Sequence, residues 1–206
     1  MSANESEQDR VATFTLTADG VEPVVVKLTQ KGKLAAGEVA GGNDDFSTLT
    51  NNNSYGKQTS KDGWVGQNCA VMSGGSNDSN PVFKTMMGTD SSVKGLTMNG
   101  KTAAVGTITS PTITTGCGKL KFKYGYPFSE SNGIKFKVEI KQDGAVVKTY
   151  TIEDKTATKL AAYDYEVEVN ISGEFQIVFT NLCPSNNASS NKDRYTIWNV
   201  EWTGCN

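Results

Sequence analysis

The second half of the chain alternates apolar and polar side chains with a period of two residues. In 119–126, Leu120, Phe122 and Tyr124 share one face of the segment, and lysines occupy the other face. Antiparallel strands with one face in water alternate in this way. Further strands with large apolar side chains are predicted at 134–141, 145–153, 165–169, 175–179 and 194–203. Together they predict an all-β, antiparallel β-sandwich.

The last predicted strand contains two of the three tryptophans. Strict alternation puts Trp198, Val200 and Trp202 on one face of this strand, which predicts that both indole rings pack in the core. Stacking of these rings on a sugar is the alternative.

The region 34–115 is less regular. Short apolar runs alternate there with polar, Gly-rich stretches, and we expect four to six short strands with long connections. The runs are 46–49, 64–72, 81–87, 103–108 and 112–114.

The N-terminal part is predicted to be a β-hairpin. Residues 11–18 and 24–29 alternate, and the turn signal Asp19-Gly20 lies between them. Two strands alone cannot bury an apolar face, so the hairpin either docks on the following domain or is the remnant of a truncated one. We therefore divide the chain into an N-terminal tail with hairpin, 1–33, and a sandwich, 34–206.

Composition narrows the classes of function. The chain has no histidine, which excludes Ser-His-Asp and Cys-His catalysis and zinc sites that contain histidine. The formal net charge is −2, so no global positive field attracts nucleic acid, and we expect no such partner. The absence of histidine does not exclude catalysis by a pair of carboxylates. The loop carboxylates that could form such a pair are Asp62, Asp78, Asp90 and Glu130. No spacing singles any of them out, and we predict that the protein is not an enzyme.

The four cysteines leave two alternatives. Cys69, Cys117, Cys183 and Cys205 include no CxxC pair, which argues against structural zinc. Two disulfides with three connectivities are one alternative, and four buried thiols are the other.

The composition is typical of an extracellular protein, although no export signal is visible. The start, MSANESEQDR, lacks a basic and an apolar region, and no apolar run is long enough to span a membrane. We therefore expect an extracellular or cell-surface protein without membrane insertion, whose native signal peptide is absent from this sequence.

Several ordered segments resemble a known kind of module. Residues 62–75, 95–113, 119–150 and 192–204 resemble the C-terminal jelly-roll modules of Bacteroidetes secreted proteins and lipoproteins, of the choice-of-anchor J type. The resemblance covers about 36–206 and implies a jelly-roll-like sandwich at the cell surface. Residues 12–32 resemble the last two strands of a BACON domain. Together these resemblances imply association with glycans, and they assign no binding residue.

Four aromatic residues are candidates for glycan binding. Trp64 follows a polar loop that also carries Tyr55, and a loop aromatic beside Asn and Asp groups suits a sugar. Tyr126 and Phe128 flank Pro127 at the end of a strand. The alternatives are a Trp64 side chain that plugs the end of the sandwich and a Tyr126–Phe128 cluster that anchors a loop.

Two sets of charged residues are also candidate binding sites. The lysines of 119–123 and 135–141 form a basic patch if their strands pair, unless Glu166 and Glu168 neutralise it. Asp44, Asp45 and Asp193 are candidate ligands of a structural calcium ion, which needs six to eight oxygens. The alternative is that these aspartates serve only as turn residues.

These observations predict a non-catalytic, extracellular carbohydrate-binding or adhesion module with a polysaccharide or glycan as its ligand. The alternative is a structural or protein-interaction module, such as a spacer, an oligomerising domain or a phage fibre or decoration component. The oligomeric state and the identity of the glycan stay open.

Overall fold

The computed structural model describes residues 6, 10–30, 39–75, 81–128, 133–182 and 193–205, and for 81–83 it describes the backbone only. The chain divides into two compact units, 1–40 and 41–206. The boundary predicted after residue 33 falls in 31–38, outside the described residues. No helix in the described part is long and apolar enough to cross a membrane.

The first unit contains the predicted hairpin. β1 (Arg10–Ala18) pairs antiparallel with β2 (Val21–Gln30), and Gly20 adopts the positive φ of 75° that the tight turn requires. Phe14 lies opposite Val26, and Leu16 lies opposite Val24, so apolar side chains gather on one face. Phe14 and Leu16 are 43% and 56% exposed. Within the first unit, nothing described covers this apolar face.

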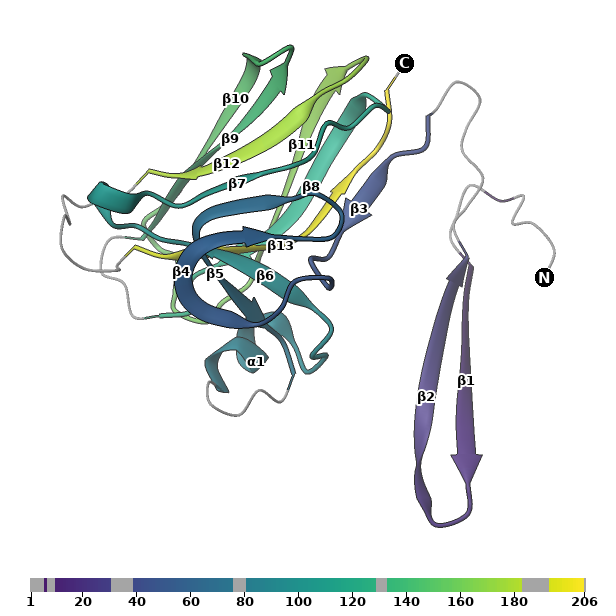
Figure 1. The fold of residues 1–206 in the computed structure, drawn as a ribbon. Coiled ribbons are helices and arrows are strands. Elements are labelled where there is room, and N and C mark those ends of the chain that lie inside the picture. The colour runs from purple at the N-terminus through teal and green to yellow at the C-terminus, as the bar shows by residue number, and fades with distance from the viewer. Residues whose placement is uncertain are drawn as a thin grey trace. The chain divides into compact units, whose positions relative to one another are not determined.

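The second unit is an antiparallel β-sandwich, as predicted (Figure 1). The hydrogen-bonded order is β10-β9-β12-β7-β5-β6-β13-β8-β11, with β3 beside β13 and β4 beside β5. The strands are β3 (Gly42–Asp44), β4 (Asn52–Thr59), β5 (Val65–Ser73), β6 (Lys94–Met98), β7 (Thr107–Thr109), β8 (Cys117–Gly125), β9 (Ile134–Gln142), β10 (Ala145–Asp154), β11 (Tyr163–Ile171), β12 (Gln176–Asn181) and β13 (Tyr195–Trp202). A 3₁₀ turn, η1 (Thr102–Ala104), precedes β7.

The two layers of the sandwich are joined on one side by β5. Residues 65–67 of β5 pair with β7, whereas residues 69–73 pair with β6. Asn68 separates the two stretches and has a φ of 53°, which bends the strand from one layer into the other. The ends of the strand order are β10 and β11. These two edge strands face each other on the open side of the sandwich, where the Tyr150 hydroxyl of β10 donates to the Glu168 carbonyl of β11 at 3.1 Å.

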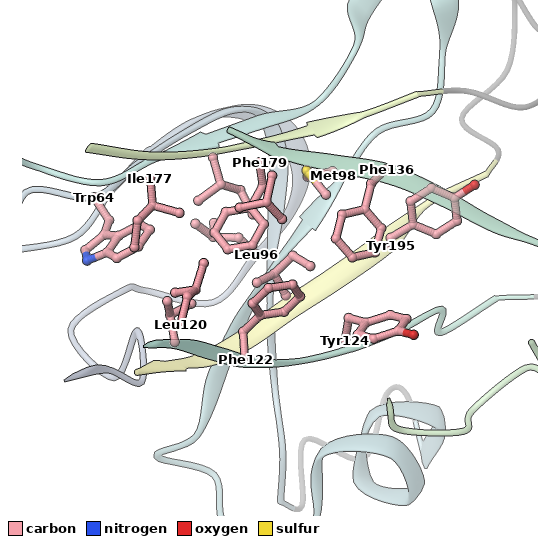
Figure 2. Packing of buried hydrophobic residues seen from close by; sticks show 14 of the residues in the cluster. Trp64, Leu96, Met98, Leu120, Phe122, Tyr124, Phe136, Ile177, Phe179 and Tyr195 are labelled. Carbon is pink, nitrogen blue, oxygen red and sulfur yellow. The ribbon is translucent and has the colours of Figure 1, made fainter. Parts of the chain in front are cut away.

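The core is filled by the inward residues of both layers, as the alternation predicts. Phe136 and Phe179 from one layer meet Phe122 and Tyr124 from the other (Figure 2). The rings of Phe122 and Phe179 stand edge to face, with their centroids 5.0 Å apart. Burying side chains of this size stabilises the fold by about 1.5–3 kcal/mol each.

The apolar run 81–87 is a helix, not a strand. α1 (Pro81–Met87) begins with proline, which suits the first helical position because its missing N–H would have no partner there. Gly88 ends the helix with a φ of 89°, and its N–H donates to the Lys84 carbonyl at 3.0 Å. Met86 and Met87 are buried on the outer face of the sheet.

These methionines belong to a second apolar cluster that also contains Trp198. Trp198 is 2% exposed, so its predicted burial is confirmed. The prediction that it shares a face with Val200 is wrong, because Val200 lies in the main core. Asn199 between them has a φ of 48° at a register shift of β13. This bulge breaks the alternation.

Gly95 of β6 allows α1 to approach the sheet. A side-chain carbon at this position would lie 2.7 Å from Thr196 Cγ2 and 3.0 Å from Met87 Cε. We expect Gly95→Ala to lower the free energy of unfolding by about 1–3 kcal/mol, because buried atoms must shift. Urea denaturation measures this change.

Gly56→Ala is the matched control, because a carbon added to this β4 residue meets nothing within 4 Å. We expect it to stay within about 0.5 kcal/mol of the wild type. Equal losses in both variants would contradict the packing described for α1.

Candidate functional site

Two of the four predicted aromatic residues lie in the core. Trp64 is 2% exposed, and its ring meets the Phe46 ring edge to face at 5.3 Å. Its backbone N–H donates to Ser60 Oγ at 3.0 Å. Tyr126 is also buried, and its hydroxyl donates to the Ala157 carbonyl at 2.6 Å. Their positions match the alternatives of an end plug and a loop anchor, since neither ring offers a face to a ligand.

The other two predicted residues, Tyr55 and Phe128, are half-buried against the second apolar cluster. One face of the Phe128 ring is covered by Arg194, whose Cζ lies 3.8 Å from the ring centroid. The structure therefore separates the four candidates between two clusters, and they do not form one platform.

A different group of aromatic side chains lies at the open side of the sandwich. We call Tyr150 of β10 with Tyr163 and Tyr165 of β11 the tyrosine edge. All three residues are half-buried and pack against the main core. In the described part, β11 pairs only with β8, and β10 pairs only with β9. The tyrosine edge therefore lies along strands whose outer backbone edge carries no neighbouring strand.

The rings on β11 are supported from beneath by β8. Tyr163 lies opposite Tyr124 in the strand register, and Tyr165 lies opposite Phe122. The Tyr124 and Tyr163 rings are stacked, with a centroid distance of 5.3 Å and an interplanar angle of 27°. The Phe122 and Tyr165 rings are 5.1 Å apart at 31°. Such cross-strand aromatic pairs restrict the ring orientation, so the half-exposed rings are held in place.

Polar contacts bound the tyrosine edge at both ends. At one end, the Tyr163 hydroxyl accepts a hydrogen bond of 2.8 Å from the Thr158 N–H. At the other end, the Tyr150 hydroxyl spans the two layers to reach the Glu168 carbonyl. The accessible part of the tyrosine edge, which we call the row, is therefore short and runs along β11 from Tyr163 to about Val167.

The hydroxyls of this region stay neutral. Burial raises the pKa of Tyr124, Tyr150 and Tyr165 above the usual value, and for Tyr124 the charge of Asp154 raises it further. Tyr150 and Tyr165 therefore present uncharged phenol groups at physiological pH. The sequence placed Tyr165 on an inward face, but it carried no signal that β11 ends its layer, and so the tyrosine edge was missed.

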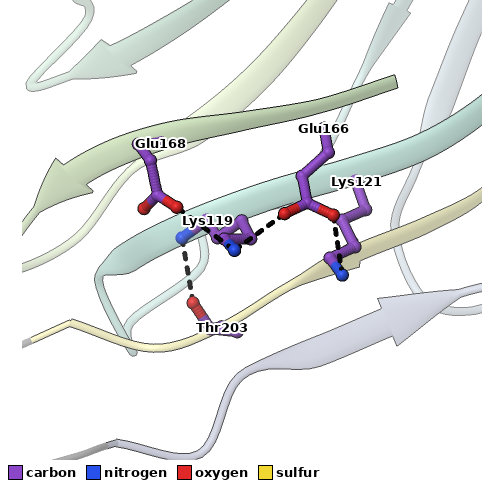
Figure 3. Close-up of polar contacts among 5 residues, drawn as sticks. All are labelled: Lys119, Lys121, Glu166, Glu168 and Thr203. Atoms are coloured by element: carbon purple, nitrogen blue, oxygen red, sulfur yellow. Dashed lines mark hydrogen bonds and ion pairs between the residues drawn. The ribbon is translucent and has the colours of Figure 1, made fainter. Parts of the chain in front are cut away.

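The lysine-rich strands form no joint basic patch. β8 and β9 lie in different layers, so the condition that these strands pair is not met. On β8 and β11, Lys119 Nζ lies 2.7 Å from Glu166 Oε1, and Lys121 Nζ lies 2.8 Å from Glu166 Oε2 (Figure 3). These hydrogen bonds lower the pKa of Glu166 to about 2. The outer face is thus neutralised by cross-strand pairs.

The three predicted calcium ligands are not gathered at one point. Asp44 pairs with Val200 near the end of β13, whereas Asp193 precedes the start of this strand. A strand rise of about 3.3 Å per residue places them roughly 20 Å apart. Within the described ranges, no group of three or more His, Cys, Asp or Glu residues is placed to hold a metal ion.

Asp44 instead closes a turn after β3. Its Oδ1 accepts a hydrogen bond of 2.6 Å from the Phe46 N–H. Burial raises the pKa of Asp44 to about 6, the bond from Phe46 opposes this shift, and the charges of Asp62 and Asp45 add to it.

This shift predicts a pH-dependent stability. The pKa of Asp44 is higher in the folded state than in the unfolded chain. Its protonated carboxyl therefore contributes to the free energy of unfolding below about pH 4, and this contribution is lost as the pH rises through about 6. Asp44→Asn removes the dependence and keeps an acceptor for the Phe46 N–H. We expect the free energy of unfolding of the variant, relative to the wild type, to rise by up to about 3 kcal/mol between pH 4 and 7.

Asp45→Asn is the control, because exposed Asp45 accepts an equivalent bond of 2.9 Å from the Ser47 N–H. Because the Asp45 charge is the smallest of the contributions that raise the pKa of Asp44, the stability difference between Asp45→Asn and the wild type should change much less over this range than that of Asp44→Asn. Parallel pH profiles for the wild type and Asp44→Asn in chemical denaturation would contradict the shift.

The two candidate catalytic carboxylates that the structure describes, Asp62 and Asp90, accept hydrogen bonds from different residues. Asp62 Oδ2 accepts a bond of 3.1 Å from Thr48 Oγ1. Hydrogen bonds from Ser92 lower the pKa of Asp90, whereas a general acid needs a raised pKa. Asp78 and Glu130 lie outside the described residues.

Cys69 and Cys117 are buried thiols, and no disulfide joins any two of Cys69, Cys117 and Cys205. Cys183 lies beyond the described ranges, so the two-disulfide alternative is not tested for it.

Comparisons with known proteins give similarities among solved structures only. No family model and no curated protein matches the chain. The K2 cleaved adhesin domain of Lys-gingipain is 12% identical with a TM-score of 0.48, over 79% of this chain and 97% of that chain. TmCBM61 in complex with beta-1,4-galactotriose is 12% identical with a TM-score of 0.44, over 69% and 88%.

A third similar structure is a glycoside hydrolase family 43 arabinoxylan arabinofuranohydrolase from Bacillus subtilis in complex with cellotetraose. It is 11% identical with a TM-score of 0.44 over 76% of this chain, and the chain spans 28% of its length. Several further neighbours are carbohydrate-binding modules of families 6 and 29. At these identities the similarity concerns the fold alone.

Proposed function

We propose that this chain is a non-catalytic carbohydrate-binding module and that its glycan lies along the tyrosine edge. The observation that carries the proposal is the placement of Tyr150, Tyr163 and Tyr165, three half-buried aromatic residues on the two edge strands. Aromatic rings that are flush with the surface offer apolar faces to the C–H side of a sugar ring.

The surroundings of the tyrosine edge suit an uncharged, hydroxyl-rich ligand. Burial raises the pKa of Tyr150 and Tyr165 further from neutral pH, and the nearby carboxylates Asp164 and Glu166 are paired with Lys123 and Lys121. The backbone edges of β10 and β11 supply N–H and C=O groups that sugar hydroxyls can bind. Because the row is bounded at both ends, the ligand is a short stretch of a neutral glycan.

The setting of the module is part of the same proposal. The resemblance of 36–206 to choice-of-anchor J-type modules favours a surface or secreted protein of the Bacteroidetes type. In that setting, the chain holds a larger protein on a polysaccharide.

A glycan array with neutral and acidic polysaccharides tests this function. We expect binding to a neutral glycan, and hydrogen exchange should then slow in 145–154 and 163–171 when the glycan is added. An array without a binder would overturn the proposal. Protection confined to the surroundings of Tyr55 and Phe128 would move the site to the second apolar cluster.

One observation favours a second function, a protein-interaction module. Seven of the nine exposed large hydrophobic residues in the described part belong to the β1–β2 hairpin, including Phe14, Leu16 and Val24. Exposed apolar patches mark interaction sites. Multi-angle light scattering over a concentration series checks this function, and we expect Leu16→Lys to shift any oligomer toward monomer. A strict monomer in both proteins argues against it.

A further inference from the structure

Two cysteines that are distant in the sequence lie on neighbouring segments where the chain leaves β13. Cys117 begins β8 and is fully buried in the main core. Cys205 follows the end of β13 and is half-buried. The pairing of β8 with β13 continues past Trp202, since the Gly118 N–H donates to the Thr203 carbonyl at 2.9 Å.

The residues on both sides of Cys117 touch the segment that carries Cys205. The Cys205 N–H donates to the Thr115 carbonyl at 3.0 Å. A side-chain carbon at Gly116 would collide with the Cys205 carbonyl oxygen, and one at Gly118 would lie 3.0 Å from the Gly204 carbonyl oxygen. The two glycines therefore let residues 204–205 lie directly against the backbone around Cys117.

This contact places Cys117 and Cys205 on neighbouring backbone segments, with Cys205 beside Gly116, the residue before Cys117. Directly opposite residues on antiparallel strands have Cα atoms about 4.5–5.5 Å apart, and a disulfide bridges Cα atoms about 4.4–6.8 Å apart. Burial raises the pKa of Cys117 to about 12, and the charge of Cys205 adds to this shift, as expected for two nearby sulfur atoms.

Cys69 is placed differently. It lies beside the bend of β5, and its thiol is engaged with the carbonyls of Thr107 at 3.3 Å and Gln67 at 3.4 Å. It makes no contact with 204–205 comparable to that of Gly116.

We propose that Cys117 and Cys205 are a disulfide-forming pair that links the start of β8 to the end of β13 when the protein meets an oxidising small-molecule disulfide. The inference is independent of glycan binding, because it concerns the opposite end of β8 from Tyr124. It selects one of the three connectivities that four cysteines allow, with Cys69 and Cys183 left over.

The reaction consumes one oxidant molecule. The thiolate of Cys205, the more exposed residue, attacks oxidised glutathione, which forms a mixed disulfide and releases glutathione thiolate. Cys117 then gives up its proton to that thiolate and attacks the Cys205 sulfur, which releases the second glutathione. Two cysteine thiols are oxidised, and one glutathione disulfide is reduced to two thiols.

Peptide mapping tests the pair directly, because trypsin places each cysteine in a separate peptide. These peptides are 62–84, 102–119, 160–192 and 195–206. After incubation of the intact chain with oxidised glutathione, we expect 102–119 linked to 195–206, and dithiothreitol should separate them. The oxidised protein should melt about 5–10 °C higher than the reduced one, since the bond closes a long loop.

Two variants complete the test. Cys205→Ser should lose the linked peptide and the oxidation-dependent rise in Tm, and because this residue is half-buried the variant should fold. Cys69→Ser should keep both. A link from 195–206 to 160–192, or four thiols that stay open to alkylation after oxidation, would overturn the proposal.

Discussion

Replacing Tyr163 and Tyr165 together by alanine should weaken glycan binding about 100-fold. The two rings are the half-buried aromatic side chains on β11, and each packs against a β8 ring. Truncating a central aromatic residue of an interface costs more than about 1–2 kcal/mol, or roughly tenfold in Kd for each ring. Isothermal titration calorimetry with the glycan found on the array measures the change.

The controls for this prediction separate binding from folding. Tyr55→Ala removes a half-buried tyrosine of the second apolar cluster and should leave Kd within about twofold of the wild type. Tyr163→Phe keeps the ring and loses only the acceptor for the Thr158 N–H, so it should bind nearly as well. If the alanine pair binds like the wild type while Tyr55→Ala does not, the ligand lies elsewhere.

Trp64→Ala should be the most damaging single substitution for stability among the aromatic candidates. The side chain is 2% exposed and packs edge to face on Phe46, so its removal leaves a large cavity. Such substitutions cost about 3–5 kcal/mol, and the Tm of a chain of this length should fall by roughly 6–20 °C. Differential scanning calorimetry measures the loss.

Trp64→Phe provides the graded control, because it keeps an aromatic ring against Phe46 and leaves a smaller cavity. We expect its loss to be less than half that of the alanine variant. If Trp64 were a ligand platform, Trp64→Ala would fold with an unchanged Tm and lose glycan binding. That result would restore Trp64 as a binding residue.

The strands of the second half could be predicted because their evidence is local. The alternation of Leu120, Phe122 and Tyr124 with lysines predicts which side of β8 is buried, whatever strands lie beside it. The same holds for β9, where Phe136 and Val138 point inward. Each of these segments needs only its own residues to define its apolar face.

Local evidence failed where a single backbone residue interrupts the pattern. Asn199 and Asn68 adopt positive φ angles, one at the bulge of β13 and the other at the bend of β5. A strict period of two cannot anticipate such residues, so Trp198 was assigned to the wrong face. The run 81–87 was ambiguous because a short apolar segment suits a strand or a buried helix turn.

Local sequence patterns were enough to predict the fold class and the inward residues of β8 and β9, and the composition excluded histidine-dependent chemistry. The tertiary structure was needed to show which strands end the two layers, and therefore which tyrosines are only half-buried. It also placed the lysine strands in separate layers and brought Cys205 against Gly116. The physical reason is that the alternation of side chains depends on neighbouring residues, whereas exposure at an edge depends on pairings between segments far apart in the chain.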